Sequence, residues 1–177
     1  MHTHTILKIA VIGLGHQSVE DHIPAIRASK DVQFVAIAEI NKEKLDKFLS
    51  ENNDVHSYTS TEEMFKKEKL DLVIIALPHY MYQEVMKQAI ENKVHVLKEK
   101  PFAMSLKEAK EIRDLANKNN VQVSVTLQRR FNPIYSTFFQ LLDKIGDPFY
   151  IESKYTFYTD SPHTGWRGEK SWLVVVV

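Results

Sequence analysis

The 177-residue chain contains no cysteine. Disulfide bonds, thiolate nucleophiles, cysteine zinc sites and iron–sulfur clusters are therefore excluded. Neither sign of charge predominates, because 23 basic residues balance 23 acidic ones, so no overall field favours nucleic acid or an anionic membrane. No apolar run approaches the roughly 18 residues that a membrane-spanning helix needs. We therefore expect a cytoplasmic protein that has neither a membrane nor a nucleic-acid partner.

Glycine is also scarce, with five residues in the whole chain, and two of them are Gly13 and Gly15. Hydrophobic residues make up 44% of the composition, which is enough to bury a core. At roughly 100 to 200 residues per domain, the length allows one full domain and at most part of a second.

Short apolar runs rich in Val, Ile and Leu alternate with amphipathic stretches over the first 126 residues. This alternation predicts an α/β fold with a doubly wound parallel sheet, covered by helices on both faces. The six expected strands are 6–12, 32–38, 56–58, 72–77, 94–97 and 121–126. Helix starts are indicated by Asn41, by Ser60 or Thr61, and by a capping box of Ser105 and Glu108.

The pattern changes beyond residue 130. Asn132 and Pro133 are expected to begin a helix that ends before the Gly-Asp-Pro turn at 146–148. Residues 149–158 then alternate with a period of two, which predicts a strand of an antiparallel sheet. We therefore expect a first domain over residues 1–130, and the first helix and strand of an incomplete α+β second domain over residues 131–177.

The two glycines follow an apolar strand and precede a helix expected to extend toward Ala28. Such a turn lets a pyrophosphate approach the backbone, and the helix start supplies N–H donors and a favourable dipole. Serine stands where the third glycine of the usual fingerprint would be, and it is small enough to keep the helix close to the strand. The residues predicted to bind a dinucleotide here are Gly13, Gly15, His16, Gln17 and Ser18.

Glu39 ends the second expected strand, where a carboxylate would accept hydrogen bonds from the adenosine ribose hydroxyls. Its charge would repel a 2′-phosphate, so NAD is favoured over NADP, although Lys42 and Lys44 keep NADP open. For these residues alone two alternatives remain. One is a plain strand-to-helix turn beside a solvated carboxylate, and the other is an S-adenosylmethionine site of the methyltransferase kind.

A more specific motif is the stretch 95–103, His-Val-Leu-Lys-Glu-Lys-Pro-Phe-Ala. It resembles the EKP signature of the Gfo/Idh/MocA family, the NAD(P)-dependent oxidoreductases related to glucose-fructose oxidoreductase and inositol dehydrogenase. The resemblance covers residues 6 to about 171. The segments that share it are the glycine turn, 22–25, 76–78, 128–133 and 165–168.

The resemblance implies that Glu99 and Lys100 lie beside the nicotinamide ribose and the substrate, with Pro101, often cis in this family, fixing the turn. Lys100 would be the catalytic residue, hydrogen-bonding a substrate hydroxyl and stabilising negative charge on its oxygen as hydride leaves. The other residues that it assigns to the cofactor are Leu77, Pro78, His79, Tyr82 and Gln128, and those that it assigns to the substrate are Arg130, Trp166 and Arg167.

Two of these positions depart from the family pattern, which commonly has Asn and His where this chain has His79 and Tyr82. Both could instead be surface residues at a helix start, and Gln128 and Arg130 could belong to a solvated charged turn. The eight histidines show no metal-ligand spacing, so no metal is expected.

The implied substrate is a sugar, polyol or cyclitol. The family's acid–base histidine segment has no counterpart after the tryptophan-arginine pair, and His163 is a weak substitute. We therefore expect a truncated or frame-shifted member with impaired catalysis, and the alternative is a non-catalytic NAD(P)-binding sensor or scaffold. The second domain would be the start of a substrate and dimerisation domain. Its unpaired strand would allow homo-oligomer formation.

Overall fold

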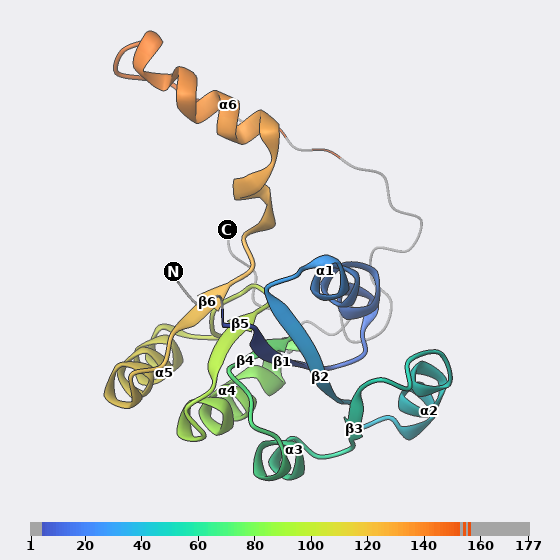
Figure 1. The fold of residues 1–177 in the computed structure, drawn as a ribbon. Coiled ribbons are helices and arrows are strands. Elements are labelled where there is room, and N and C mark those ends of the chain that lie inside the picture. Colours follow the sequence, from blue (N-terminus) through green and yellow to red (C-terminus); the bar gives the residue numbers. More distant parts are fainter. Residues whose placement is uncertain (1–4, 153, 155, 157–177) are drawn as a thin grey trace. The chain divides into compact units, whose positions relative to one another are not determined.

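A computed structural model of the chain describes residues 5–152, 154 and 156 (Figure 1). The chain divides into two compact units, the first running to Thr126 and the second beginning at Leu127. Each unit is described separately below.

The first unit is built on a parallel six-stranded sheet with the order β3-β2-β1-β4-β5-β6. The strands are β1 Leu7–Ile12, β2 Val32–Ala38, β3 His56–Tyr58, β4 Leu72–Ile75, β5 His95–Lys98 and β6 Val123–Val125. This arrangement confirms the predicted doubly wound α/β fold and all six strands. β6 is shorter than its apolar run because only three of its residues pair with β5.

Three of the helices between the strands, those that begin at Lys42, Thr61 and Leu106, start directly after predicted capping residues. All the helices between the strands are η1 Ser18–His22, α1 Ile23–Ala28, α2 Lys42–Glu51, α3 Thr61–Lys67, η2 His79–Met81, α4 Tyr82–Glu91 and α5 Leu106–Asn119. The Asn41 side chain accepts the Lys44 N–H at 3.0 Å. In the box at α5, the Glu108 carboxylate accepts the N–H of Met104, one residue before the capping serine.

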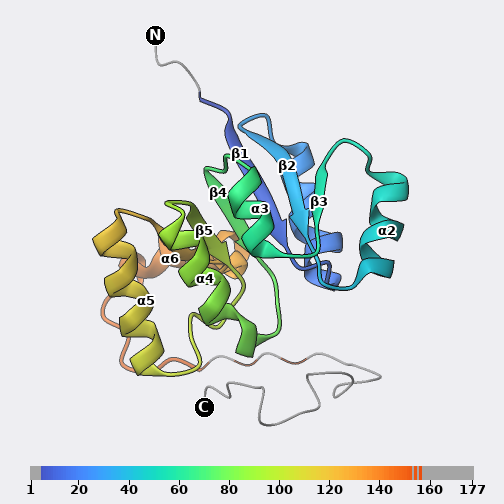
Figure 2. The same ribbon diagram turned by 90° about the horizontal axis from the view of Figure 1, so that it is seen from below.

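Helices cover both faces of the sheet and create two cores. In Figure 1, α3, α4 and α5 lie below the sheet and α1 lies above it. Figure 2 is seen from below, so these three helices lie in front of the sheet. Met64, Met86 and Ile112 are fully buried in the first core, whereas Ile26 and Leu45 bury against the second face. Both faces of the central strands are therefore apolar, and functional groups are left to the strand ends.

The second unit contains η3 Gln128–Phe131, α6 Pro133–Leu141 and η4 Leu142–Lys144. Asn132 begins α6 as predicted, because its side chain accepts the Ile134 N–H at 2.9 Å. The structure shows no strand at residues 149–152, 154 and 156, in contrast to the prediction for 149–158. A period-two pattern forms a strand only beside a hydrogen-bonded neighbour, and the described part of this unit offers none.

No helix in the described part of the chain is long and apolar enough to cross a membrane.

Candidate functional site

The predicted site residues of the first unit follow the carboxyl ends of four parallel strands. The glycine turn follows β1, Glu39 follows β2, Leu77 and Pro78 follow β4, and the EKP stretch follows β5. β1 pairs with β2 on one side and with β4 on the other, so the strand order reverses at β1. In a doubly wound sheet, ligands bind in the crevice that forms at this reversal.

Gly13 and Gly15 differ in why each must be small. Gly13 has a φ of +98°, and a Cβ at this position would lie 2.4 Å from the carbonyl oxygen of Ala76 and 2.9 Å from Leu77 Cδ2. No side chain fits there, so this glycine serves the turn itself. Apart from its two chain neighbours, the nearest atom of the described residues to a Cβ at Gly15 would be the Ala76 carbonyl oxygen, at 4.0 Å. The space beside Gly15 is therefore open, as a site for a pyrophosphate requires.

A helical turn begins directly after the glycines. The N–H groups of Ser18 and Val19 both donate to the Gly15 carbonyl oxygen, at 3.1 and 3.2 Å. The N–H groups that precede them have no intrahelical acceptor, because the first turn of any helix leaves its donors unused. Ser18 is fully buried, so a small residue does allow close packing where the fingerprint has glycine. His16 is exposed, and the Gln17 amide donates to the Asp21 carboxylate.

Glu39 is tied to the glycine turn. One carboxylate oxygen accepts the Leu14 N–H at 2.7 Å and the other accepts the Asn41 N–H at 2.9 Å. Each carboxylate oxygen has two lone pairs, so both retain the capacity to accept a ligand hydroxyl. Sequence reasoning placed Glu39 at the site but missed this second task, which is to hold the turn in place.

Glu99 connects the EKP stretch to the first helix. Its side chain is buried, with Oε1 3.1 Å from His22 Nε2 and Oε2 3.2 Å from Lys100 Nζ. Burial would raise the pKa of Glu99, but the hydrogen bond with His22 and the charge of Lys100 lower it to about 2. The carboxylate is therefore ionised and holds Lys100, whose side chain is 57% exposed, at the rim of the site.

The Lys100–Pro101 peptide bond is cis, as the resemblance implied.

His79 and Tyr82, the two positions that depart from the family pattern, are half-buried and buried, respectively. Tyr82 is 2% exposed, and its ring centroid is 5.8 Å from that of half-buried His79. The interpretation of Tyr82 as a surface residue is therefore wrong. The tyrosine packs under the end of β5, since Lys98 Nζ lies 3.6 Å from its ring centroid.

The remaining predicted residues belong to the second part of the chain. Gln128 and Arg130 are exposed residues of η3 in the second unit. Trp166, Arg167 and His163 lie outside the described residues.

Sequence reasoning missed Lys98 and gave His22 no role of its own. Lys98 ends β5 and is fully buried, and burial lowers its pKa to about 7 although the charges of Glu108 and Glu99 oppose this. The signal in the sequence was a charged residue directly after the apolar residues Val96 and Leu97. His22 pairs with a residue 77 positions away, and no local pattern reveals such a contact.

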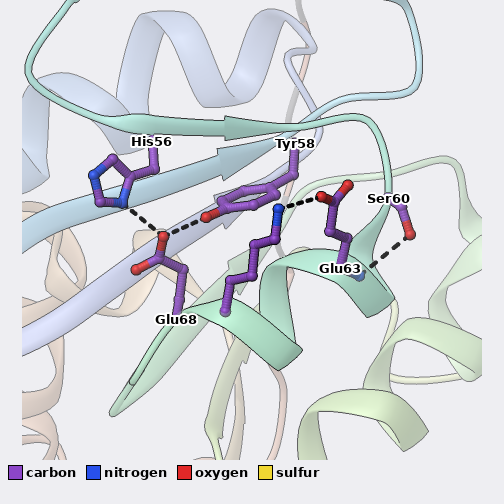
Figure 3. Close-up of polar contacts among 6 residues, drawn as sticks. His56, Tyr58, Ser60, Glu63 and Glu68 are labelled. Atoms are coloured by element: carbon purple, nitrogen blue, oxygen red, sulfur yellow. Dashed lines mark hydrogen bonds and ion pairs between the residues drawn. The ribbon is translucent and has the colours of Figure 1, made fainter.

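A second polar cluster joins β3 to α3 at the edge of the sheet (Figure 3). The Glu68 carboxylate accepts a hydrogen bond from the Tyr58 hydroxyl and lies 2.6 Å from His56 Nδ1. Burial, together with the hydrogen bond to Glu68, raises the pKa of Tyr58 to about 12. No predicted site residue contributes a side chain to this cluster, and we interpret it as structural. Among the described residues no three His, Asp or Glu side chains are grouped as a metal ion would need.

The strand order, the glycine turn and the carboxylate after β2 together define a Rossmann-type dinucleotide-binding domain. The family model for oxidoreductases with an NAD-binding Rossmann fold, Gfo/Idh/MocA, matches residues 7–127. The chain therefore belongs to the Gfo/Idh/MocA oxidoreductase family.

Individual relatives agree with this assignment. An uncharacterized oxidoreductase of Synechocystis is 35% identical over 137 residues, which are 77% of this chain and 36% of the relative. The trans-1,2-dihydrobenzene-1,2-diol dehydrogenase of Xenopus tropicalis is 31% identical over 75% of this chain and 40% of its own length. The NADP(+)-linked scyllo-inositol 2-dehydrogenase of Bacillus subtilis is 27% identical, over 80% of this chain and 43% of the enzyme. The chain thus spans less than half the length of these relatives.

The fold also matches solved structures. Scyllo-inositol dehydrogenase from Lactobacillus casei, solved with NAD(H) and scyllo-inositol, superposes with a TM-score of 0.75 at 23% identity. The match covers 81% of this chain and 43% of the enzyme. At this identity the similarity concerns the fold.

Proposed function

We propose that this chain binds NAD at the carboxyl edge of its sheet. It contributes the nucleotide site and the lysine for hydride transfer from a hydroxyl-bearing carbon of a polyol or cyclitol. The observation that carries the proposal is the open space at Gly15 beside the Glu39 carboxylate. A pyrophosphate fits the first feature, and a ribose diol fits the second. Because the family is NAD-binding, the S-adenosylmethionine alternative is set aside.

NAD rather than NADP is the proposed cofactor. An adenosine ribose bound by Glu39 would bring a 2′-phosphate against an ionised carboxylate, which is repulsive at short range. The Bacillus subtilis relative named for NADP(+) leaves the choice to be tested on this chain, where exposed Lys42 and Lys44 begin α2. We expect the repulsion of a 2′-phosphate by Glu39 to exceed its attraction to the two lysines. Backbone hydrogen bonds hold the Glu39 carboxylate at the site, whereas both lysines are solvated.

The substrate class rests on the relatives. Scyllo-inositol and trans-dihydrobenzenediol are both ring compounds with adjacent hydroxyl groups, so we propose a cyclic polyol. The nicotinamide supplies the hydride acceptor when NAD is bound. The Lys100 ammonium would donate a hydrogen bond to the reacting hydroxyl oxygen and stabilise the negative charge that develops there as the hydroxyl proton passes to water. The ion pair with Glu99 keeps that ammonium at the rim of the site, and the contact between His22 Nε2 and the other carboxylate oxygen holds Glu99 in place.

A fluorescence titration with NADH tests the cofactor proposal. We expect Glu39→Ala to weaken NADH binding about ten-fold or more, because a charge-assisted hydrogen bond contributes roughly 1.5–3 kcal/mol. Lys100→Ala should bind nearly as well as the parent, since Lys100 serves the substrate. Glu51→Ala, an exposed carboxylate of α2, is the matched control and should bind like the parent. No binding by the folded parent, or full binding by Glu39→Ala, would contradict the proposal.

Turnover is a separate question. The predicted catalytic impairment and the sensor alternative both stay predictions. Incubating the chain with NAD and scyllo-inositol, while following NADH absorbance, distinguishes an active enzyme, which forms NADH, from an impaired enzyme or a sensor, which does not. Turnover that disappears in Lys100→Ala would support the role of Lys100, and turnover unchanged in that variant would contradict it.

A further inference from the structure

Lys98 is a buried cation at the carboxyl end of β5, the strand next to the edge of the sheet. As the last residue of β5, it lies beside Ile75 of β4 and Val125 of β6, and no part of it is exposed. An ammonium in such a place is costly unless its donors are satisfied. Its contacts should therefore indicate why a lysine stands where the other central strands place apolar residues.

The Lys98 ammonium binds the turn that follows its own strand. Nζ donates to the carbonyl oxygen of Pro101 and, at 3.2 Å, to that of Phe102. On another side it faces the ring of Tyr82, 3.6 Å from the centroid. Two donors thus meet carbonyls, and the positive charge meets an aromatic face, which is a favourable arrangement for a desolvated ammonium.

The turn held in this way carries the two residues of the candidate active site. Its beginning is fixed by the sheet, because the Glu99 N–H donates to the Ile75 carbonyl at 3.0 Å. Its end is held by Lys98 through residues 101 and 102. Glu99 and Lys100 lie between these two attachments, so the direction of the Lys100 side chain depends on both.

We propose that Lys98 is a positioning residue, whose buried ammonium locks the 99–102 turn against Tyr82 and so sets the place of Glu99 and Lys100 at the nicotinamide end of the site. This inference rests on the proposed function for the role of the turn. The contacts of the Lys98 ammonium with the carbonyls of residues 101 and 102 and with the Tyr82 ring, called the clamp below, are a property of the fold. The residue acts through the turn and does not touch the cofactor.

The clamp should depend on pH. The titratable groups around the ammonium are Glu99 on the same turn, Glu108 of α5 and Tyr82 of α4. Burial lowers the pKa of Lys98 to about 7, so its proton is lost as the pH rises through neutrality. The neutral amine loses the charge that strengthens the carbonyl bonds and the contact with the ring.

Lys98→Met removes the charge at nearly the same volume, and Lys110→Met makes the same change at an exposed position of α5. Amide exchange by NMR reports the turn through the Glu99 and Met104 N–H groups, which donate to Ile75 and Glu108. In Lys98→Met we expect these amides to exchange at least ten-fold faster, while amides of β1 and β2 keep their protection. Lys110→Met should match the parent. Unchanged exchange at the turn in Lys98→Met would overturn the inference.

A spectroscopic measurement separates positioning from a purely structural role. Nicotinamide fluorescence of bound NADH should change with pH in the parent, with a midpoint near 7, and this step should be absent in Lys98→Met. The Phe102 amide shift of the free parent should titrate with the same midpoint, which tests the clamp even if the variant does not fold. A flat Phe102 titration would overturn the inference. If the parent binds no NADH, the cofactor proposal fails, while amide exchange and the Phe102 titration still decide the role of Lys98.

Discussion

The two glycines of the turn should respond in opposite ways to the same substitution. In Gly13→Ala the new methyl group would meet the Ala76 carbonyl oxygen at 2.4 Å, at a φ of +98°. A positive φ costs a non-glycine residue about 1–2 kcal/mol, and overpacking adds about 1–3 kcal/mol. We therefore expect a loss of roughly 3 kcal/mol in the free energy of unfolding, a large share of the 5–15 kcal/mol typical of a domain.

Gly15→Ala should leave the fold intact and disable the site. Among the described residues that are not its chain neighbours, its methyl group would come no closer than 4.0 Å, to the Ala76 carbonyl oxygen. We therefore expect the free energy of unfolding to stay within about 1 kcal/mol of the parent. The same methyl group would occupy the space proposed for the pyrophosphate, so NADH affinity should fall at least ten-fold. Urea unfolding and an NADH titration on both variants measure the two effects. Parent-like stability in Gly13→Ala, or parent-like affinity in Gly15→Ala, would refute the reasoning.

Two further predictions concern pH. The folded pKa of Glu99, about 2, is below its ordinary value of 4.5, so its contribution to stability is full above pH 4.5 and is lost as the pH falls toward 2. We expect Glu99→Gln to remove a contribution on the order of 3 kcal/mol from the acid side of the pH–stability curve, and an identical curve for parent and variant would contradict this. The folded pKa of Tyr58, about 12, is above 10, so its contribution is full below pH 10 and is lost as the pH rises to 12. Tyr58→Phe should abolish that alkaline loss, and a tyrosinate absorbance titration with no group near 12 in the parent would argue against it.

Local patterns in the sequence predicted the elements of the fold well. The apolar runs located every strand of the sheet, and Asn41, Ser60, Ser105 and Asn132 each cap the helix expected of them. Each of these caps joins residues two or three positions apart, and a buried parallel strand is a short apolar run, so both signals are contained in a short window.

The contacts that assemble the site were harder to predict because they join distant parts of the chain. Glu39 reaches back 25 residues to the Leu14 N–H, and His22 meets Glu99 across 77 residues. A lysine ordinarily indicates an exposed side chain, whereas Lys98 is buried against the Tyr82 ring and the carbonyl groups of residues 101 and 102. Period-two alternation was misleading at residues 149–152 for the opposite reason, because it predicts a strand without supplying the neighbour that a strand needs.

The central claim, that the carboxyl edge of this sheet is an NAD site, is tested most directly by NMR shift mapping of the chain during a titration with NAD. The account predicts saturable shifts of the Gly13 and Gly15 amides and of the residues around Glu39, with smaller ones at the 99–102 turn. A folded chain whose spectrum does not change with NAD, or whose shifts gather at the amino ends of the strands, would contradict it.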